Sequence, residues 1–177
     1  TDSRIFGAEH LSETIKKEFF DNAFVNDTLR QLYGVDSLTG RTLLAQQVEA
    51  IPGNLGSGGR WHRDSLPQQF KAFLYFTPVT VDSGPLQVYP GSHRFLNKCI
   101  AAGRRGRQWK RLDYDSPELV KNSVSKGVKE VSVTGGEGML VFADTSIIHR
   151  GKPGLTADRY SATYYAFKNE IPFHIND

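Results

Sequence analysis

The spacing of hydrophobic residues changes along the chain, from a helical period near the N-terminus to short strand-like runs after it. Between residues 8 and 34, apolar side chains recur every three or four positions, and Ser12 provides a start signal. We therefore expect two helices in this region. From Thr42 onward, apolar and aromatic runs separated by Gly, Pro, Asn and Asp turns predict strands. The expected strands are 42–50, 59–63, 69–77, 86–90, 128–134, 139–143, 146–150 and 159–168.

Strands in this number are sufficient for a jelly roll, in which two sheets close around a narrow interior. The pattern therefore predicts a mainly β, cupin-like fold with flanking N-terminal helices. We treat residues 1–177 as a single domain, with helices at about 8–34 and a β core at about 42–168. The connection at about 92–127 is long, and loops of such length are usually lids or disordered segments. It contains Ser116-Pro117-Glu118, which favours a short helix.

The composition fits one domain and excludes several classes of protein. A chain of 177 residues can bury one sizeable core, and its 38% hydrophobic and 23% charged residues are ordinary for a globular protein. The single cysteine, Cys99, excludes an internal disulfide and a cysteine-based zinc site. The sequence has no apolar run of the roughly 18 residues that a membrane span requires, and no signal-peptide pattern. The expected location is cytoplasmic, and the sequence predicts no particular oligomeric state.

Positive charge is concentrated in the long connection. The net charge is only +3, but five basic residues crowd around Trp109, namely Arg104, Arg105, Arg107, Lys110 and Arg111. One interpretation is a solvated loop face. The other is a lid that contacts a phosphate, carboxylate or carrier-linked group of a small-molecule substrate. A nucleic-acid partner is not expected, because no known binding fold is recognised and one aromatic residue interleaves the charges.

The tripeptide His62-Arg63-Asp64 carries the main candidate chemistry. On an extended segment, side chains two residues apart project to the same face, so His62 and Asp64 can reach one metal ion. His149, at the end of another strand-like run, provides a third ligand. Two imidazoles and one carboxylate suit a ferrous ion with positions left for a chelating cosubstrate and oxygen. The alternative is a surface hydrogen bond between His62 and Asp64, with His149 as a buried structural histidine.

Arg159 opens the last predicted strand, ten positions after His149. A guanidinium forks onto a carboxylate through two parallel hydrogen bonds, so it suits the distal carboxylate of a keto diacid. Ser161 shares the face of Arg159, because side chains alternate along a strand. We therefore expect both residues to bind the cosubstrate.

The strand at 69–77 contributes a second set of candidates. Lys71, Phe73 and Tyr75 share one face, and they line the cosubstrate pocket if this face points inward. Otherwise they form a packed face from which Lys71 extends outward. Arg63 points away from the ligands on an ideal strand, so we expect it at the surface or the pocket mouth. For His93, we expect a structural hydrogen bond.

Three groups of residues resemble the phytanoyl-CoA dioxygenase family of Fe(II)- and 2-oxoglutarate-dependent oxygenases. They are Trp61-His62-Arg63-Asp64, Gly84-Pro85-Leu86 leading to Pro90-Gly91-Ser92-His93, and Ile148-His149-Arg150-Gly151 with Arg159. The resemblance runs from about Leu43 to Phe167 and implies a double-stranded β-helix. Two departures from the family are expected: the strand that usually precedes the first helices is not recognisable in the sequence, and the inserts that contact substrate in the family have no assignable match.

The resemblance also implies a mechanism. Fe(II) would bind His62, Asp64 and His149, while 2-oxoglutarate would chelate the iron and place its far carboxylate on Arg159 and Ser161. O2 would take the remaining position. The expected reaction converts 2-oxoglutarate to succinate and carbon dioxide and hydroxylates an aliphatic C–H bond of a small molecule. Asp64 favours hydroxylation, because related halogenases have a small residue there and bind chloride instead.

Two other classes of protein are compatible with these residues. One is a non-catalytic β-helix module that binds a metal or a small carboxylate without turnover. The other is a cupin-like metal enzyme that uses the same ligands without 2-oxoglutarate. The complete ligand set argues against the first class, and Arg159 argues against the second.

Overall fold

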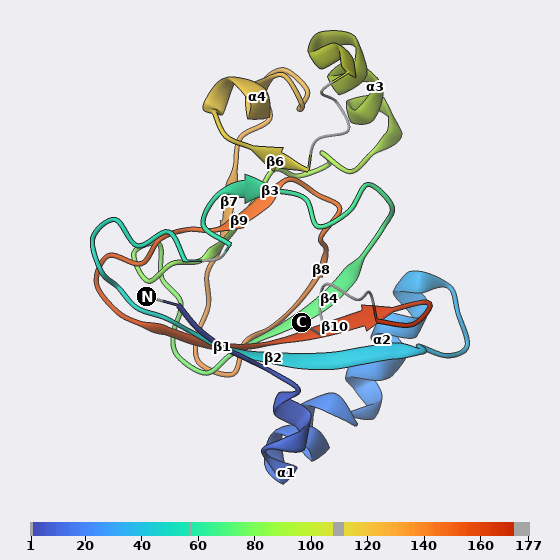
Figure 1. Ribbon diagram of the computed structural model, residues 1–177, viewed down its shortest axis with the longest axis vertical. Coiled ribbons are helices and arrows are strands. Elements are labelled where there is room, and N and C mark those ends of the chain that lie inside the picture. Colours follow the sequence, from blue (N-terminus) through green and yellow to red (C-terminus); the bar gives the residue numbers. More distant parts are fainter. Residues whose placement is uncertain (1, 57, 108–111, 172–177) are drawn as a thin grey trace.

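Two antiparallel sheets face each other in the computed structural model, which describes residues 2–56, 58–107 and 112–171 (Figure 1). The first sheet has the order β1-β2-β10-β4-β8, and the second has the order β6-β3-β9-β5-β7. The strands are β1 (Asp2–Phe6), β2 (Gly40–Val48), β3 (Trp61–His62), β4 (Phe70–Tyr75), β5 (Leu86–Val88), β6 (Asp113–Tyr114), β7 (Val131–Val133), β8 (Leu140–Asp144), β9 (His149–Gly151) and β10 (Arg159–Phe167). Each predicted strand range overlaps one of these strands, and the predicted mainly β jelly roll is confirmed.

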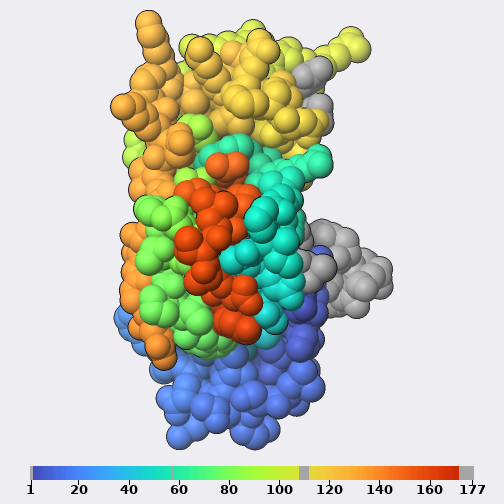
Figure 2. All heavy atoms as spheres, turned by 90° about the vertical axis from the view of Figure 1, so that its left-hand side faces the viewer, coloured from blue at the N-terminus to red at the C-terminus, as the bar shows by residue number. Residues whose placement is uncertain are grey.

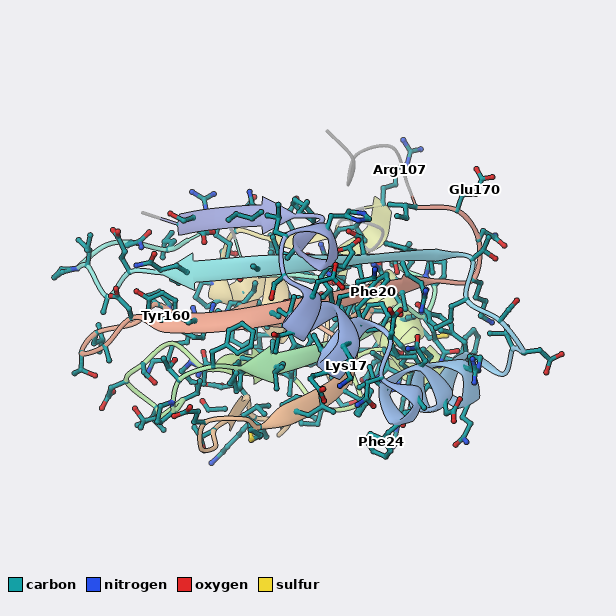
Figure 3. All side chains as sticks on the ribbon, turned by 90° about the horizontal axis from the view of Figure 1, so that it is seen from below. Lys17, Phe20, Phe24, Arg107, Tyr160 and Glu170 are labelled. Carbon is teal, nitrogen blue, oxygen red and sulfur yellow. The ribbon has the colours of Figure 1, made fainter. Side chains whose placement is uncertain are left out.

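The N-terminal helices cover the outer face of the first sheet (Figure 1). They are η1 (Ala8–His10), α1 (Glu13–Ile15), the π-helix η2 (Lys16–Phe20) and α2 (Ala23–Tyr33). The Ser12 side chain caps α1 by accepting a hydrogen bond from the Ile15 amide, as its position in the sequence indicated. Phe20 lies over the sheet, whereas Phe24 points outward from α2 and is 66% exposed (Figure 3). No helix within the described ranges is long and apolar enough to span a membrane.

The two faces of the first sheet have different surroundings. On the outer face, Leu43, Ala162 and Tyr164 are fully buried against the helices. On the inner face, residues at the alternate positions of the same strands, including Gln46 and Ser161, line a cavity between the sheets. This alternation follows from the period of two along a strand. Apolar packing on one face therefore holds the sheet, and the polar inner face is available for ligands.

The segment 92–127 covers the outer face of the second sheet. It forms α3 (Phe95–Arg105), β6 and α4 (Pro117–Lys121), and the last of these is the short helix predicted near Ser116. A second apolar core joins Tyr114, Val120 and Val124 to Ile148 of the sheet region. The N-terminal helices and this segment lie at opposite ends of the molecule, with the sheets between them (Figure 2).

None of the described residues of segment 92–127 lines the cavity, so the lid interpretation of this segment stays a prediction. Val120 of α4 packs into the second apolar core, whereas Phe95 and Leu96 of α3 are exposed. Of the basic stretch, Arg104 donates to the Val124 carbonyl, and Arg105 is buried with its guanidinium bound to Ser123. Lys110 and Arg111 lie outside the described residues.

A strand does precede the first helices, contrary to the expectation from the sequence. β1 pairs with β2 over its whole length, from Asp2 opposite Val48 to Phe6 opposite Leu44. It is an edge strand with one neighbour, and most of its residues are exposed. Such a short, exposed strand has little hydrophobic signal, so its pattern did not reveal it.

Candidate metal centre

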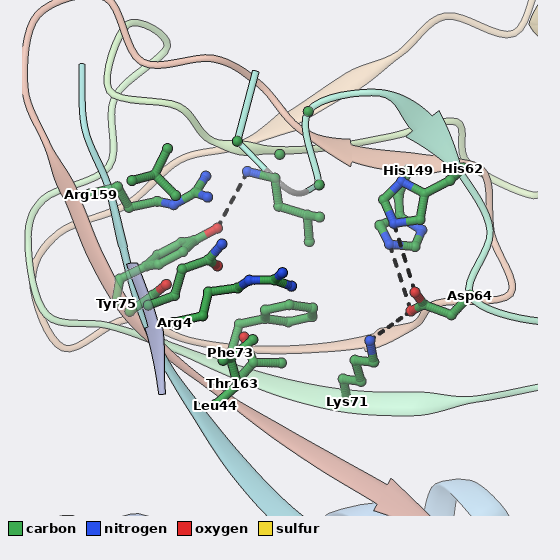
Figure 4. A pocket seen from close by; sticks show the side chains of 18 of the residues that line it. Arg4, Leu44, His62, Asp64, Lys71, Phe73, Tyr75, His149, Arg159 and Thr163 are labelled. Carbon is green, nitrogen blue, oxygen red and sulfur yellow. Dashed lines mark hydrogen bonds and ion pairs between the residues drawn. The ribbon is translucent and has the colours of Figure 1, made fainter. Parts of the chain in front are cut away.

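A cavity of about 230 Å³ lies between the two sheets (Figure 4). Its floor is the inner face of β2, β4 and β10, and β3 and β9 of the second sheet lie across from it. All the site residues predicted from the sequence line this cavity, namely His62, Asp64, Lys71, Tyr75, His149, Arg159 and Ser161. The fold therefore brings together residues that are widely separated in the chain.

Three possible metal ligands converge at one end of the cavity. His62 of β3 stands directly opposite His149 of β9 in the antiparallel register, and their ring centroids are 4.3 Å apart. The Asp64 carboxylate faces both rings, with its oxygens 3.7 Å from His62 Nε2 and 3.8 Å from His149 Nε2. The possible ligand atoms of the three residues all lie within 4.8 Å of one another.

Backbone carbonyls fix the orientation of both imidazoles. His62 Nδ1 is 2.8 Å from the Arg60 carbonyl, and His149 Nδ1 is 3.0 Å from the Ile147 carbonyl. Because a carbonyl oxygen can only accept, both Nδ1 atoms carry the proton and donate it. The Nε2 lone pairs are then directed toward Asp64. Such a hydrogen bond behind each ring is typical of metal-binding histidines.

The electrostatic environment gives the ligands the protonation states that a metal requires. Burial alone would raise the pKa of Asp64, but the Lys71 ammonium and His149 outweigh this effect and lower it from 3.8 to about 2. Burial lowers the pKa of His149 from 6.5 to about 4, against the opposing attraction of Asp64. At neutral pH, the site therefore has an ionised carboxylate and a neutral buried imidazole. This donor set, two imidazoles and one carboxylate facing an open cavity, fits Fe(II).

Lys71 lies beside the ligands rather than beside Arg159. Its Nζ atom is 2.8 Å from Asp64 Oδ2 and lies 3.8 Å from the centroid of the Tyr165 ring. The residue is only 5% exposed, so the alternative of an outward-extending lysine is wrong. Lys71, Phe73 and Tyr75 do share the inward face of β4, as one of the two interpretations of this strand required.

Arg159 occupies the other end of the cavity (Figure 4). It is buried, and one terminal nitrogen donates to the Gly84 carbonyl, while Nε has no hydrogen-bond partner among the described residues. Gly151 leaves room for the guanidinium, because a Cβ at this position would be 3.2 Å from Arg159 Nη2. Burial lowers the pKa of Arg159, but a guanidinium starts so high that it stays charged. A buried cation with an unused donor is a suitable site for an anion.

Ser161 and Tyr75 flank this end of the cavity. They are opposite each other in the register of β10 and β4. The Tyr75 hydroxyl accepts a hydrogen bond from the Leu86 amide at 3.4 Å, and burial raises the pKa of Tyr75. The hydroxyl therefore keeps its proton at neutral pH and can donate it to a carboxylate in the cavity.

Three residues differ from what the sequence led us to expect. Arg4 of β1 lines the cavity, but its strand was not recognised. Arg63 is 4% exposed and lies behind the ligands instead of at the surface or mouth, because segment 92–127 covers this face. His93 does not line the cavity, and its buried Nδ1 has no hydrogen-bond partner among the described residues, contrary to the bond we expected.

A jelly roll with two histidines and one carboxylate in its interior defines a class of protein, the iron- and 2-oxoglutarate-dependent oxygenases. The phytanoyl-CoA dioxygenase (PhyH) family model matches residues 3–161, and the chain belongs to this family. Fe(II), 2-oxoglutarate and O2, which the resemblance implied, are the cofactors of this family.

Curated and solved relatives support the same family and fold. The ectoine dioxygenase of Stutzerimonas stutzeri (strain A1501) is 25% identical over 118 residues, which cover 62% of this chain and 38% of that protein. The iron-bound EctD structure from S. alaskensis is 21% identical with a TM-score of 0.65, covering 96% of this chain and 58% of EctD. The epimerase SnoN in complex with Fe3+, alpha ketoglutarate and nogalamycin RO is 16% identical with a TM-score of 0.63, covering 99% of this chain and 69% of SnoN. The chain thus spans less than two thirds of the length of the ectoine dioxygenase and EctD.

Proposed function

We propose that this chain is an Fe(II)- and 2-oxoglutarate-dependent oxygenase domain that hydroxylates an aliphatic C–H bond of an anionic small molecule. The observation that carries the proposal is the shared cavity, with His62, Asp64 and His149 at one end and Arg159 at the other. A metal at the first end and a carboxylate at the second would hold a keto diacid between them. Ectoine dioxygenase, a family relative, provides a precedent for small-molecule oxidation.

Each residue then has a defined task. His62, Asp64 and His149 would hold the iron. Burial keeps His149 neutral by lowering its pKa, and the Lys71 ammonium beside Asp64 lowers the pKa of this carboxyl and keeps it ionised. Arg159 would bind the far carboxylate of 2-oxoglutarate, and the Tyr75 and Ser161 hydroxyls beside it would donate hydrogen bonds. With O2, the iron and 2-oxoglutarate supply the oxidation that yields succinate, carbon dioxide and a hydroxylated product. The protein positions these groups.

Asp64 supports hydroxylation over halogenation. A halide needs a coordination position that no protein ligand occupies, and here the Asp64 carboxylate faces both imidazoles. Lys71 holds this carboxylate at 2.8 Å, so the ligand has a fixed position. The residue that would have to be small for halide binding is therefore a carboxylate that is held beside both imidazoles.

Arg4 supports an anionic substrate. Figure 4 shows its side chain extending into the cavity near Phe73 and Tyr75. The other two cations that line the described cavity have assigned partners, since Lys71 contacts Asp64 and Arg159 would bind the cosubstrate. The ion pair of Arg4 with Asp2 is long, at 3.8 Å, and its side chain is 45% exposed, so Asp2 neutralises it only weakly. A carboxylate or phosphate group on the substrate would neutralise the Arg4 guanidinium.

The cofactor part of the proposal is tested by conversion of 2-oxoglutarate to succinate without substrate. Wild-type protein with Fe(II) and ascorbate should form succinate slowly, because this family chemistry runs uncoupled at a low rate. Asp64→Ala should form none above the iron-only blank. Arg159→Gln should raise the KM for 2-oxoglutarate while keeping iron binding. Equal succinate formation by all three proteins would refute the proposed site.

The substrate part is tested with pairs of aliphatic carboxylic acids and their uncharged methylamides, matched in length. The acids should stimulate succinate formation more than the amides, and Arg4→Gln should abolish this preference. Arg60→Gln is a suitable control, because Arg60 is exposed and does not line the cavity. A preference that survives in Arg4→Gln, or that Arg60→Gln removes equally, would contradict the role of Arg4.

A further inference from the structure

A buried arginine lies directly behind the candidate metal ligands. Arg63 stands between His62 and Asp64 in the sequence, but its side chain points to the opposite side of the strand and is 4% exposed. Among the described residues, no carboxylate pairs with it. Instead it binds neutral oxygens. Nε donates to the Tyr114 hydroxyl at 2.7 Å, Nη2 donates to the Ser92 carbonyl at 3.0 Å, and Nη1 donates to the Ser146 carbonyl.

These partners come from the segments that carry or adjoin the ligands. Ser146 lies three residues before His149, in the turn between β8 and β9. Ser92 lies in the turn after β5, and its hydroxyl accepts a hydrogen bond from the Ile148 amide at 2.8 Å. Ser92 therefore contacts Arg63 through its carbonyl and the His149 segment through its side chain. Arg63 and Ser92 together link the His62–Asp64 segment to the His149 segment.

The backbone pairing between these two segments is short. β3 has two residues and β9 has three, and they share a single pair in register, His62 with His149. One backbone hydrogen bond flanks this pair on each side, from the Gly151 amide to the Gly58 carbonyl at 2.7 Å and from the Asp64 amide to the Thr145 carbonyl at 3.0 Å. In a longer ladder, many hydrogen bonds would hold two side chains at a given separation. Here the planar guanidinium, which has five donors in a rigid fork, can hold several carbonyls in one arrangement.

Burying a charge among neutral partners is an expensive way to stabilise a fold. The desolvation penalty of such a group commonly matches or exceeds what its interactions return, and apolar side chains of similar volume often serve stability as well. A buried guanidinium at this position is better explained by the geometry it imposes. Partners behind metal ligands commonly change metal affinity by about 10- to 100-fold.

We infer that Arg63 and Ser92 are positioning residues, which hold the two ligand segments at the separation that the metal requires. The inference rests on the proposed iron site, but it concerns the protein scaffold rather than the reaction. Neither residue lines the cavity or contacts a reacting atom. Their effect reaches the metal through the backbone of residues 62–64 and 146–149.

The test measures metal affinity and folding separately. Mn(II), which does not oxidise in air, is titrated by calorimetry into the wild type and into Arg63→Gln, Arg63→Lys and Ser92→Ala. The melting temperature of each metal-free protein is followed by circular dichroism. Arg63→Gln should weaken Mn(II) binding by about 10- to 100-fold. Arg63→Lys should bind Mn(II) more tightly than Arg63→Gln, because it keeps a donor and the charge. Ser92→Ala should weaken Mn(II) binding severalfold.

Arg105→Gln is the matched control. Arg105 is also a buried arginine, and its guanidinium lies 4.7 Å from the same Tyr114 ring. Its described hydrogen bond goes to Ser123, which is not near the ligands in the chain. This variant should lower the melting temperature of the metal-free protein but change Mn(II) affinity by less than about threefold, since it removes no contact to the ligand segments. The absorption spectrum of bound Co(II) should change in Arg63→Gln and not in Arg105→Gln, because the spectrum reports ligand geometry.

The outcomes distinguish this inference from the proposed function. If the wild type binds no Mn(II), both are wrong. If the wild type binds Mn(II) and Arg63→Gln binds it equally well, or loses no more than Arg105→Gln, the positioning role alone is overturned. If Arg63→Gln does not fold, Ser92→Ala decides the matter. Full affinity and an unchanged Co(II) spectrum in that variant would overturn the role.

Discussion

The two ends of the cavity are built in different ways. Arg159 begins the nine-residue strand β10, which pairs with β2 on one side and with β4 on the other. The metal ligands His62 and His149 lie on strands of two and three residues, and Asp64 lies beyond the end of β3. The carboxylate end takes its position from long ladders of backbone hydrogen bonds. The metal end depends on side chains that bind backbone carbonyls.

One small jelly roll thus positions the two ends of its cavity by different means. Along β10, a shift of Arg159 would require the pairing of the whole strand to change, since side-chain position follows register. Between β3 and β9, one register pair, its flanking backbone hydrogen bonds and the hydrogen bonds of Arg63 and Ser92 set the ligand separation. We therefore expect substitutions at one end to change metal binding and substitutions at the other to change 2-oxoglutarate binding, each without the other. The following measurements test this expectation.

The largest effect should come from removing a metal ligand. His149→Ala should weaken Mn(II) binding by at least about 100-fold, which exceeds the usual loss from an outer partner. Arg159→Gln should change Mn(II) affinity by less than about twofold, because it lies at the other end of the cavity. It should weaken 2-oxoglutarate binding to the Mn(II)-loaded protein by at least about 30-fold, since a buried charge loses its partner. Calorimetry measures both affinities, and parallel losses of metal binding in the two variants would show that the ends are coupled.

A smaller effect is expected in the pH dependence of folding of the metal-free protein. The pKa of His149 is lowered from 6.5 to about 4 by burial, so the unfolded chain binds a proton in this range that the native protein excludes. The stability that neutral His149 contributes is complete above pH 6.5 and is lost as the pH falls through 4. The slope should approach about 1.4 kcal/mol per pH unit at most.

Urea unfolding in EDTA at pH 7, 6, 5 and 4 measures this slope. His149→Asn should flatten it between pH 6.5 and 4, because the substituted side chain does not titrate. Arg159→Gln should leave it unchanged, since a guanidinium stays protonated throughout this range. A slope that is the same in wild type and His149→Asn would mean that the metal end does not exclude protons as described.

The smallest effect should follow from a single methyl group beside Arg159. In Gly151→Ala, the new Cβ would lie 3.2 Å from Arg159 Nη2, so the guanidinium must move by a few tenths of an ångström. We expect 2-oxoglutarate binding to weaken by roughly three- to tenfold, or about 1 kcal/mol, with unchanged Mn(II) affinity. Gly103→Ala is the control, because no atom lies within 4 Å of a Cβ at that position. Unchanged 2-oxoglutarate affinity in Gly151→Ala would show that the guanidinium tolerates displacement.

The candidate site was largely predictable because its signals are local. His62 and Asp64 are two residues apart, and the alternation of an extended segment is enough to put them on one face. The same alternation grouped Lys71 with Tyr75 and Arg159 with Ser161. The prediction of a shared pocket required only that these faces point inward.

Other features depended on contacts between distant segments. Arg4 reaches the cavity because β1 pairs with β2, and a short exposed edge strand has little pattern of its own. Arg63 is buried because segment 92–127 packs over it, and the alternation of β3 says only that it faces away from the ligands. One interpretation of the basic stretch was a lid, but none of the described residues of segment 92–127 lines the cavity, and Tyr114, Val120 and Val124 of this segment pack with Ile148.

The sequence by itself determined the chemical groups of the site, the faces they share and the period-two pattern that builds two sheets. The tertiary structure alone decided which face each distant segment covers, and therefore that Arg63 is enclosed and that Arg4 lines the cavity. The physical reason is that alternation along a strand is fixed by local backbone geometry. The covering of a face depends on which apolar surfaces find each other across the folded chain.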